Sequence, residues 1–221
     1  MSTPSTGLVH LVDDDPSVLR SLARLLRAEG LESRTWGRAA DFLADPDAAK
    51  LPACLVLDLR MPEMDGLTLQ AELLRRGLRL PVIFLTAHAD VPASVRAVKS
   101  GAVDFLLKPF VPEQLLGVVR AALERSAEGM QEATHLEALR ARHSDLTPRE
   151  RQVFDLVVRG LLNKEVAAEL GAAEKTIKVH RARVMRKMGA DSLAGLVQQA
   201  VLLGLLSPSA VPAVRTEPVR A

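Results

Sequence analysis

LVHLVDDDP, residues 8–16, decides the fold of the first half of the chain. Five mostly apolar residues are followed at once by three aspartates and a proline. Asp15 can cap a helix, and Pro16 suits its first position. A short apolar run followed by a helix start is typical of a βαβ unit, and nearly continuous apolar runs indicate strands buried on both faces of a parallel sheet. We therefore expect a strand that ends at Val12 and a helix over residues 16–29.

The same alternation continues to about residue 125. Further strands are expected over residues 31–36, 53–58, 81–86 and 103–108, the first of them the weakest. Helices are expected between and after them, over residues 38–44, 67–76, 91–100 and 112–125. This pattern predicts an α/β fold, a five-stranded parallel sheet with helices on both faces. If the strand order is 2-1-3-4-5, as in flavodoxin-like folds, a crevice opens at the carboxyl edge between the first and third strands.

Polar residues stand at the ends of four of these strands: Asp13 and Asp14, Asp58, Thr86, and Lys108. In a parallel sheet these ends share one edge. Clustered carboxylates repel one another unless a cation or a proton intervenes, and Mg²⁺ prefers carboxylate oxygens. A carboxylate beside Mg²⁺ and a lysine can attack phosphorus, so Asp58 is the candidate nucleophile.

A second domain is predicted to start at Thr147-Pro148-Arg149-Glu150, where Thr147 and Glu150 can form a capping box. Helices are expected over residues 148–159, 164–170, 174–188 and 192–205. The residues before this domain are rich in helix formers and predict a helical connector. Its apolar stripe consists of Met130, Ala133, Leu136 and Leu139. We expect this stripe to pack locally, with pairing between two copies of the chain as the alternative.

The predicted helix over residues 174–188 carries many basic side chains, which indicates either a polyanionic partner or a solvated face. With the preceding helix it forms a helix-turn-helix, which favours DNA. Ile177, Val184 and Met188 share the face that would pack. On the other face, the candidates for base contacts are Lys178, Val179 and Ala182. The candidates for phosphate contacts are Lys175, Thr176, His180, Arg183, Arg186 and Lys187, of which His180 fits a packing role equally well.

Composition excludes several classes of protein. Cys54 is the only cysteine, so an internal disulfide is impossible, and the start MSTPSTG lacks the features of a signal peptide. The apolar stretch over residues 194–206 is interrupted by two glutamines and is shorter than the roughly 20 residues of a membrane span. We expect a cytoplasmic protein without a membrane segment.

The segments VDDDP, VLDLRMPEMDG, FLTAH and FLLKPF follow one another between Leu8 and about Arg125. In this order they resemble the receiver domain of two-component response regulators. The resemblance implies that Asp58 is the phosphoacceptor and that Mg²⁺ is surrounded by Asp13, Asp14, Asp58 and the backbone carbonyl of Arg60. It also implies that Thr86 senses the phosphoryl group, that Lys108 pairs with it, and that Phe105 is the switch aromatic, where many receivers have tyrosine. The Lys108–Pro109 bond is a candidate cis peptide.

Residues 146–205 resemble the LuxR-type helix-turn-helix of NarL/FixJ response regulators, and HRARVMRKM and DSLAGLVQQA resemble its FixJ-like branch. Two positions depart from the family pattern. Ala173 stands where a capping serine is frequent, and Leu162 stands where a polar residue is common. Loss of the serine cap would weaken the recognition helix by about 1 kcal/mol.

Together the resemblances imply a phosphorylation-controlled transcription regulator and not an enzyme. A sensor histidine kinase would phosphorylate Asp58, which would promote a homodimer that binds double-stranded promoter DNA, and RNA polymerase is a candidate further partner. The expected domains are a receiver at residues 1–125, a helical linker at 126–145, a DNA-binding domain at 146–206 and a disordered tail at 207–221. One alternative is a DNA-binding protein whose receiver is a constitutive dimerisation module. A less favoured one is a phosphatase with Asp58 as nucleophile, for which the sequence supplies no general acid.

Overall fold

The computed structural model describes residues 7–48, 52–87 and 104–207. The chain divides into two compact units, residues 1–131 and 132–221, and the boundary between them lies within the predicted linker over residues 126–145. The helix predicted over residues 91–100 and the tail predicted over residues 207–221, apart from Ser207, lie outside the described residues. Within the described ranges, no helix has the length and apolar character needed to cross a membrane.

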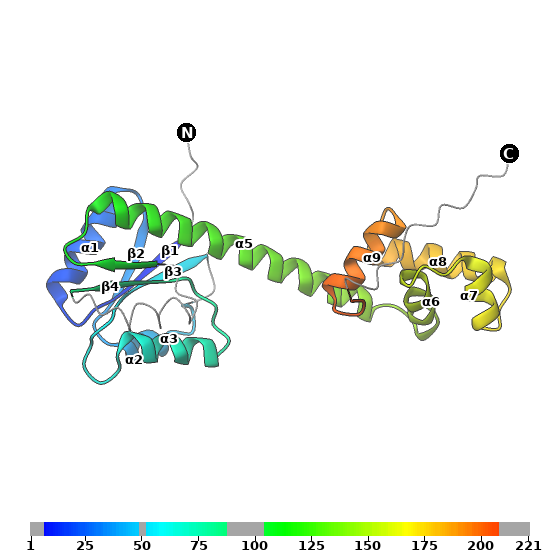
Figure 1. Cartoon of the computed structure of the whole chain (residues 1–221), viewed down its shortest axis with the longest axis horizontal. Coiled ribbons are helices and arrows are strands. Elements are labelled where there is room, and N and C mark those ends of the chain that lie inside the picture. Colours follow the sequence, from blue (N-terminus) through cyan, green and yellow to red (C-terminus); the bar gives the residue numbers. More distant parts are fainter. Residues whose placement is uncertain (1–6, 49–51, 88–103, 208–221) are drawn as a thin grey trace. The chain divides into compact units, whose positions relative to one another are not determined.

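The first unit is built on the predicted parallel sheet, with strand order β2-β1-β3-β4-β5 (Figure 1). The strands are β1 (Leu8–Val12), β2 (Glu32–Trp36), β3 (Ala53–Asp58), β4 (Val82–Thr86) and β5 (Asp104–Leu107). In register, Val12 pairs with Leu57 and Asp58 pairs with Leu85, so the carboxyl ends of three strands meet along one edge. The expectation that all strands are buried on both faces is wrong for the two edge strands. The side chains of β2 are exposed or half-buried, and in β5 only Leu106 is buried.

Helices cover both faces of this sheet (Figure 1). They are α1 (Pro16–Ala28) and α5 (Pro112–Ser144) on one face, and α2 (Ala39–Leu43) and α3 (Gly66–Arg75) on the other. Leu26 of α1 and Val119 of α5 are completely buried in one core, and Phe42 of α2 and Leu69 of α3 are buried in the other. Burial of each such side chain stabilises the fold by about 1.5 to 3 kcal/mol. The two cores therefore fix the sheet that carries the polar edge.

Helix starts at this edge are defined by side chains. Asp15 Oδ1 accepts a hydrogen bond from the Ser17 N–H at 2.7 Å, which confirms the predicted cap of α1. Asp65 caps α3 in the same way. A Cβ atom added to Gly66 would lie 2.5 Å from the carbonyl oxygen of Asp58. The glycine therefore allows α3 to start directly against the end of β3.

α5 is one helix where the sequence predicts a receiver helix and a separate connector. It runs unbroken through Gly129, whose cost of about 1 kcal/mol a helix of 33 residues tolerates. Its first part is fixed in the first unit, where the Ser126 hydroxyl oxygen accepts from the Ala53 N–H at 3.0 Å. Its last turns belong to the second unit, where Leu139 is buried. The predicted apolar stripe is not continuous, because Ala133 is exposed.

The second unit is all-α. After α5 it contains α6 (Pro148–Val158), α7 (Asn163–Glu169), α8 (Glu174–Met188) and α9 (Leu193–Leu202). α7 and α8 form the predicted helix-turn-helix, joined by a turn in which Gly171 has a φ of +59°. Phe154 of α6, Val166 of α7 and Val184 of α8 are completely buried in one core. This core holds α8 by one face only.

The predicted capping box of α6 is present and extends to α8. Thr147 Oγ1 accepts from the Glu150 N–H, and Glu150 Oε2 accepts from the Thr147 N–H. The same carboxylate accepts from Lys187 Nζ at 2.6 Å, and Glu150 is only 3% exposed. The hydrogen bond from Lys187, followed by that from the Thr147 backbone, lowers the pKa of Glu150 from 4.5 to about 2. Lys187 is therefore an internal partner of the capping box.

We expect Glu150→Gln to lower the stability of the second unit by about 1 to 2 kcal/mol at neutral pH. Because folding lowers the pKa of Glu150, its contribution is complete above pH 4.5 and is lost as the pH falls towards about 2. The melting temperature of the full chain, measured from pH 7 to pH 2, should be lower for Glu150→Gln than for wild type, and this difference should shrink below pH 4.5. Glu137→Gln on the exposed side of α5 is the control. A difference that stays constant with pH would contradict the assignment.

Ala173 precedes α8 and provides no side-chain hydrogen bond to its first turn, as the sequence predicts. Because its backbone is extended, as an N-cap requires, a serine there can accept from an N–H of the first turn. Ala173→Ser should raise the free energy of unfolding of the second unit by about 1 kcal/mol. Chemical denaturation measures this gain, with Ala172→Ser as the control. Equal effects of the two substitutions would show that no cap forms.

Candidate functional site

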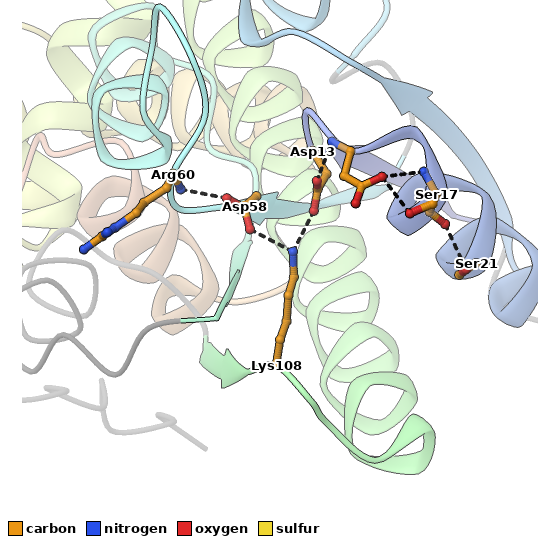
Figure 2. A network of polar contacts seen from close by, with 7 residues as sticks. Asp13, Ser17, Ser21, Asp58, Arg60 and Lys108 are labelled. Carbon is orange, nitrogen blue, oxygen red and sulfur yellow. Dashed lines mark hydrogen bonds and ion pairs between the residues drawn. The ribbon is translucent and has the colours of Figure 1, made fainter.

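The carboxyl edge of the sheet brings Asp13, Asp58 and Lys108 into contact (Figure 2). Lys108 follows β5, and its Nζ donates to Asp13 Oδ2 at 2.7 Å and to Asp58 Oδ1 at 2.8 Å. The side chains are 4% exposed for Asp13, 11% for Asp58 and 22% for Lys108. Low exposure makes these ionic contacts stronger than pairs on an open surface. The sheet thus gathers residues that are distant in the sequence into one charged cluster.

Main-chain groups orient both carboxylates. Asp13 Oδ1 accepts from the Asp15 N–H at 2.9 Å, and Asp58 Oδ2 accepts from the Arg60 N–H at 2.7 Å (Figure 2). Each carboxylate therefore has one oxygen on the backbone and the other on the ammonium of Lys108. Such charge-assisted hydrogen bonds are short and strong, so the pair is held in a defined geometry.

The charge of Lys108 is set by two opposing effects. Burial acts to lower the pKa of Lys108, but the hydrogen bonds to Asp13 and Asp58 outweigh burial, and the pKa is raised above its ordinary value. The ammonium is therefore charged at neutral pH and offsets the repulsion between the carboxylates. The Lys108–Pro109 bond is cis, which confirms the prediction.

Thr86 and Phe105 lie beside this cluster. Thr86 ends β4 and is 1% exposed, and its carbonyl oxygen accepts from the Lys108 N–H at 2.7 Å. Phe105 lies on β5 in register with Phe84, and its half-buried ring packs against the core that contains Phe84. Lacking a hydroxyl group, this ring can change its packing but cannot donate a hydrogen bond. Thr86 therefore contacts Lys108 through the backbone, and Phe105 precedes Lys108 by three residues in the chain.

The acidic pair fits a divalent cation. Two carboxylates already converge on one positive centre, and the Arg60 backbone lies against Asp58. Asp14 is exposed, in contrast to the buried Asp13. Within the part of the chain that the structure describes, acidic, histidine and cysteine side chains form no ready cluster of three for a metal. A cation would thus also need main-chain oxygens and water, a combination that suits Mg²⁺.

Sequence reasoning missed one contact close to this edge. Arg38, which precedes α2, has a guanidinium nitrogen 2.6 Å from Glu63 Oε2 in the loop between β3 and α3. Glu63 has a φ of +65°, a conformation that is uncommon for a residue with a side chain. No spacing rule connects two residues in separate loops, so the sequence held no signal for this pair.

α8 has the predicted buried and exposed faces. Ile177, Val184 and Met188 are completely buried. The exposed residues of α8 include the predicted DNA contacts Lys175, Thr176, Lys178, Val179, Ala182, Arg183 and Arg186. Val179 is 47% exposed, which leaves an apolar surface among charged side chains. The exposed face can therefore offer both charged and apolar groups to a groove.

Three basic residues of α8, Lys178, Arg181 and Lys187, have partners within the second unit. Lys178 Nζ lies 3.2 Å from Glu174 Oε1, an exposed pair one turn apart that the charge spacing could have indicated. Such pairs contribute about 0.5 kcal/mol, so DNA can displace this one. Arg181, for which the sequence indicated no role, donates to Asn163 of α7 at 3.1 Å. Lys187 donates to Glu150 and to the Asp145 carbonyl, so we expect it to support the fold and not to contact a phosphate.

His180 is half-buried, and its Nδ1 is buried without a hydrogen-bond partner among the described residues. A packing histidine usually has its buried nitrogens bonded. The position therefore does not match a satisfied packing histidine, and its contact with DNA stays a prediction.

Comparison with known proteins agrees with both halves of this description. Residues 9–120 match the response regulator receiver domain family, and residues 144–200 match the luxR family of bacterial regulatory proteins. Each match contains one of the two features described above, the charged sheet edge or the helix-turn-helix.

Similarity to individual proteins extends over both units. Nodulation protein W of Bradyrhizobium diazoefficiens is 46% identical over 201 residues, which cover 90% of this chain and 87% of that protein. The transcriptional regulatory protein FixJ of Azorhizobium caulinodans is 46% identical over 203 residues, covering 91% and 95%. The solved structure of the response regulator StyR has a TM-score of 0.79 at 44% identity. The match covers 88% of this chain and 98% of the StyR chain. The chain therefore belongs to the NarL/FixJ family of two-component response regulators, in which a receiver domain is joined to a LuxR-type DNA-binding domain that regulates transcription.

Proposed function

We propose that Asp58 accepts a phosphoryl group from a sensor histidine kinase and that this reaction controls promoter binding by α8. The observation that carries the proposal is the Lys108 ammonium, which lies within hydrogen-bond distance of both Asp13 and Asp58. A fixed positive charge beside a carboxylate can neutralise the oxygens of an incoming phosphoryl group. The same hydrogen bond holds one carboxylate oxygen of Asp58 in a defined position.

In the proposed step, a carboxylate oxygen of Asp58 attacks the phosphorus of a phosphohistidine. The new P–O bond forms as the P–N bond breaks, and the kinase histidine leaves with the electron pair of that bond. Asp13, Asp14, Asp58 and the Arg60 carbonyl would hold Mg²⁺, which adds positive charge at the transferred oxygens when bound. Lys108 would exchange its contact with Asp58 for one with the phosphoryl group.

The proposed movement of Lys108 would affect Thr86 at the end of β4 and Phe105 on β5. The carbonyl oxygen of Thr86 accepts from the backbone N–H of Lys108, so Thr86 is next to the residue whose side chain would move. Phe105 could then repack, because its ring is only half-buried. We propose that the altered surface forms a homodimer, which presents two α8 helices to half-sites about 34 Å apart. RNA polymerase is a candidate partner at the bound promoter.

Asp58→Asn should abolish phosphorylation, because an amide is too weak a nucleophile to attack phosphorus. The full chain incubated with Mg²⁺ and acetyl phosphate should gain the mass of one phosphoryl group, and Asp58→Asn should gain none. Asp155→Asn on α6 is the control and should be modified like wild type. Undiminished modification of Asp58→Asn would assign the phosphoacceptor to another residue.

Lys178→Ala should lower affinity for the preferred duplex by about 1 to 3 kcal/mol and relax specificity at one base position. The preferred duplex is the sequence that the wild-type chain enriches from a random library. Comparison of the sequences enriched by wild type and variant measures the change. If affinity falls uniformly for all sequences and the dependence on salt decreases by about one charge, Lys178 contacts a phosphate instead.

A further inference from the structure

The C-terminal end of α8 is held by a residue of α5. Arg142 Nη1 donates to the carbonyl oxygen of Met188, the last residue of α8, at 3.1 Å. The final carbonyls of a helix lack partners within the helix, and a positive group there is favourable because of the helix dipole. Gln199 of α9 donates to the same oxygen at 3.4 Å. Arg142 thus caps the C-terminal end of α8. Of the two side chains that donate to the Met188 carbonyl, Arg142 is the charged one.

The backbone at the end of α8 leaves space for this guanidinium. Gly189 has a φ of +67°, and a Cβ atom added there would lie 2.7 Å from Arg142 Nη1. The left-handed conformation favours glycine at this position. The guanidinium of Arg142 lies directly against the backbone of Gly189.

Neighbouring residues of α5 are packed into the same unit. Leu139 is 1% exposed, and the ring of His143 lies edge-on to Phe154 of α6 with centroids 5.1 Å apart. Just beyond α5, the carbonyl of Asp145 accepts from Lys187 of α8 at 3.0 Å. Leu139 is thus buried, and residues 142–145 contact both Phe154 of the core and α8, although the luxR family match begins only at residue 144.

We propose that Arg142 is a positioning residue for DNA recognition, and that the DNA-reading unit begins within α5 at about residue 139. The proposal rests on base readout by α8, as proposed above. α8 is about 22 Å long, so a tilt of about 5° at its C-terminal end moves its N-terminal end by about 2 Å. A displacement of this size breaks a hydrogen bond to a base edge. Arg142 therefore acts on the base contacts of Lys178 and Val179 from the opposite end of the helix.

The test compares Arg142→Ala with wild type on two duplexes of equal length. One is the sequence that the wild-type chain enriches from a random library in Mg²⁺ and beryllofluoride, and the other is its scrambled version. We expect Arg142→Ala to weaken binding to the enriched duplex by about tenfold. Binding to the scrambled duplex and the salt dependence should not change, because no phosphate contact is lost. Arg142→Lys should recover part of the affinity, and Arg140→Ala, an exposed arginine on the same helix, should bind both duplexes like wild type.

Three results would overturn the positioning role. Equal weakening on both duplexes with a lower salt dependence would make Arg142 a phosphate contact. A lower melting temperature with unchanged DNA affinity would make it a stabilising residue alone. Unchanged affinity and stability would mean that the hydrogen bond to Met188 has no effect. If Arg142→Ala does not fold, Arg142→Gln, which keeps a neutral donor, should show a smaller loss of affinity, confined to the enriched duplex.

A wild-type chain that enriches no sequence would contradict base readout by α8 itself. This result would be a failure of the proposed function, whereas the three results above concern Arg142 alone.

Discussion

The Lys108 ammonium, hydrogen-bonded to Asp13 and Asp58, is the interaction on which the first unit depends. Two carboxylates this well buried would repel each other without a cation, so the ion pairs with Lys108 stabilise the sheet edge. The parallel order β2-β1-β3-β4-β5 brings the ends of β1, β3 and β5 to one edge, and the cores on both faces hold the strands in register. Exchange of an Asp58 contact for a phosphoryl contact would therefore disturb an arrangement that the whole sheet supports.

In the second unit, α8 is held by one buried face while most of its surface is exposed to solvent. Ile177, Val184 and Met188 anchor one face in the core. The two ends of α8 differ in how they are held. Its start lacks a side-chain cap at Ala173, whereas its end is held through Lys187 to Glu150 and through Met188 to Arg142. The strongest attachment thus lies at the end where α5 enters the unit, away from the residues expected to read bases.

Much of this could be predicted from sequence, because the relevant signals are local. Alternating apolar segments indicate the sheet, Asp15 and Thr147 indicate helix starts, and the ends of strands place Asp58 and Lys108 together. Other features depend on contacts between distant residues. The sequence does not separate buried Asp13 from exposed Asp14, and it groups Lys187 with the DNA contacts because its ion pair with Glu150 spans 37 positions. The sequence predicts a receiver helix and a separate connector, whereas α5 is one continuous helix that tolerates Gly129.

In the proposed function, phosphorylation of Asp58 controls dimerisation of the chain. Sedimentation velocity of the full chain in Mg²⁺, with and without beryllofluoride as a phosphoryl mimic, measures this change of oligomeric state. We expect wild type to change from monomer to dimer when beryllofluoride is added, whereas Asp58→Asn should remain a monomer. Dimers of both proteins in the absence of beryllofluoride would contradict the claim and make the receiver a constitutive dimerisation module.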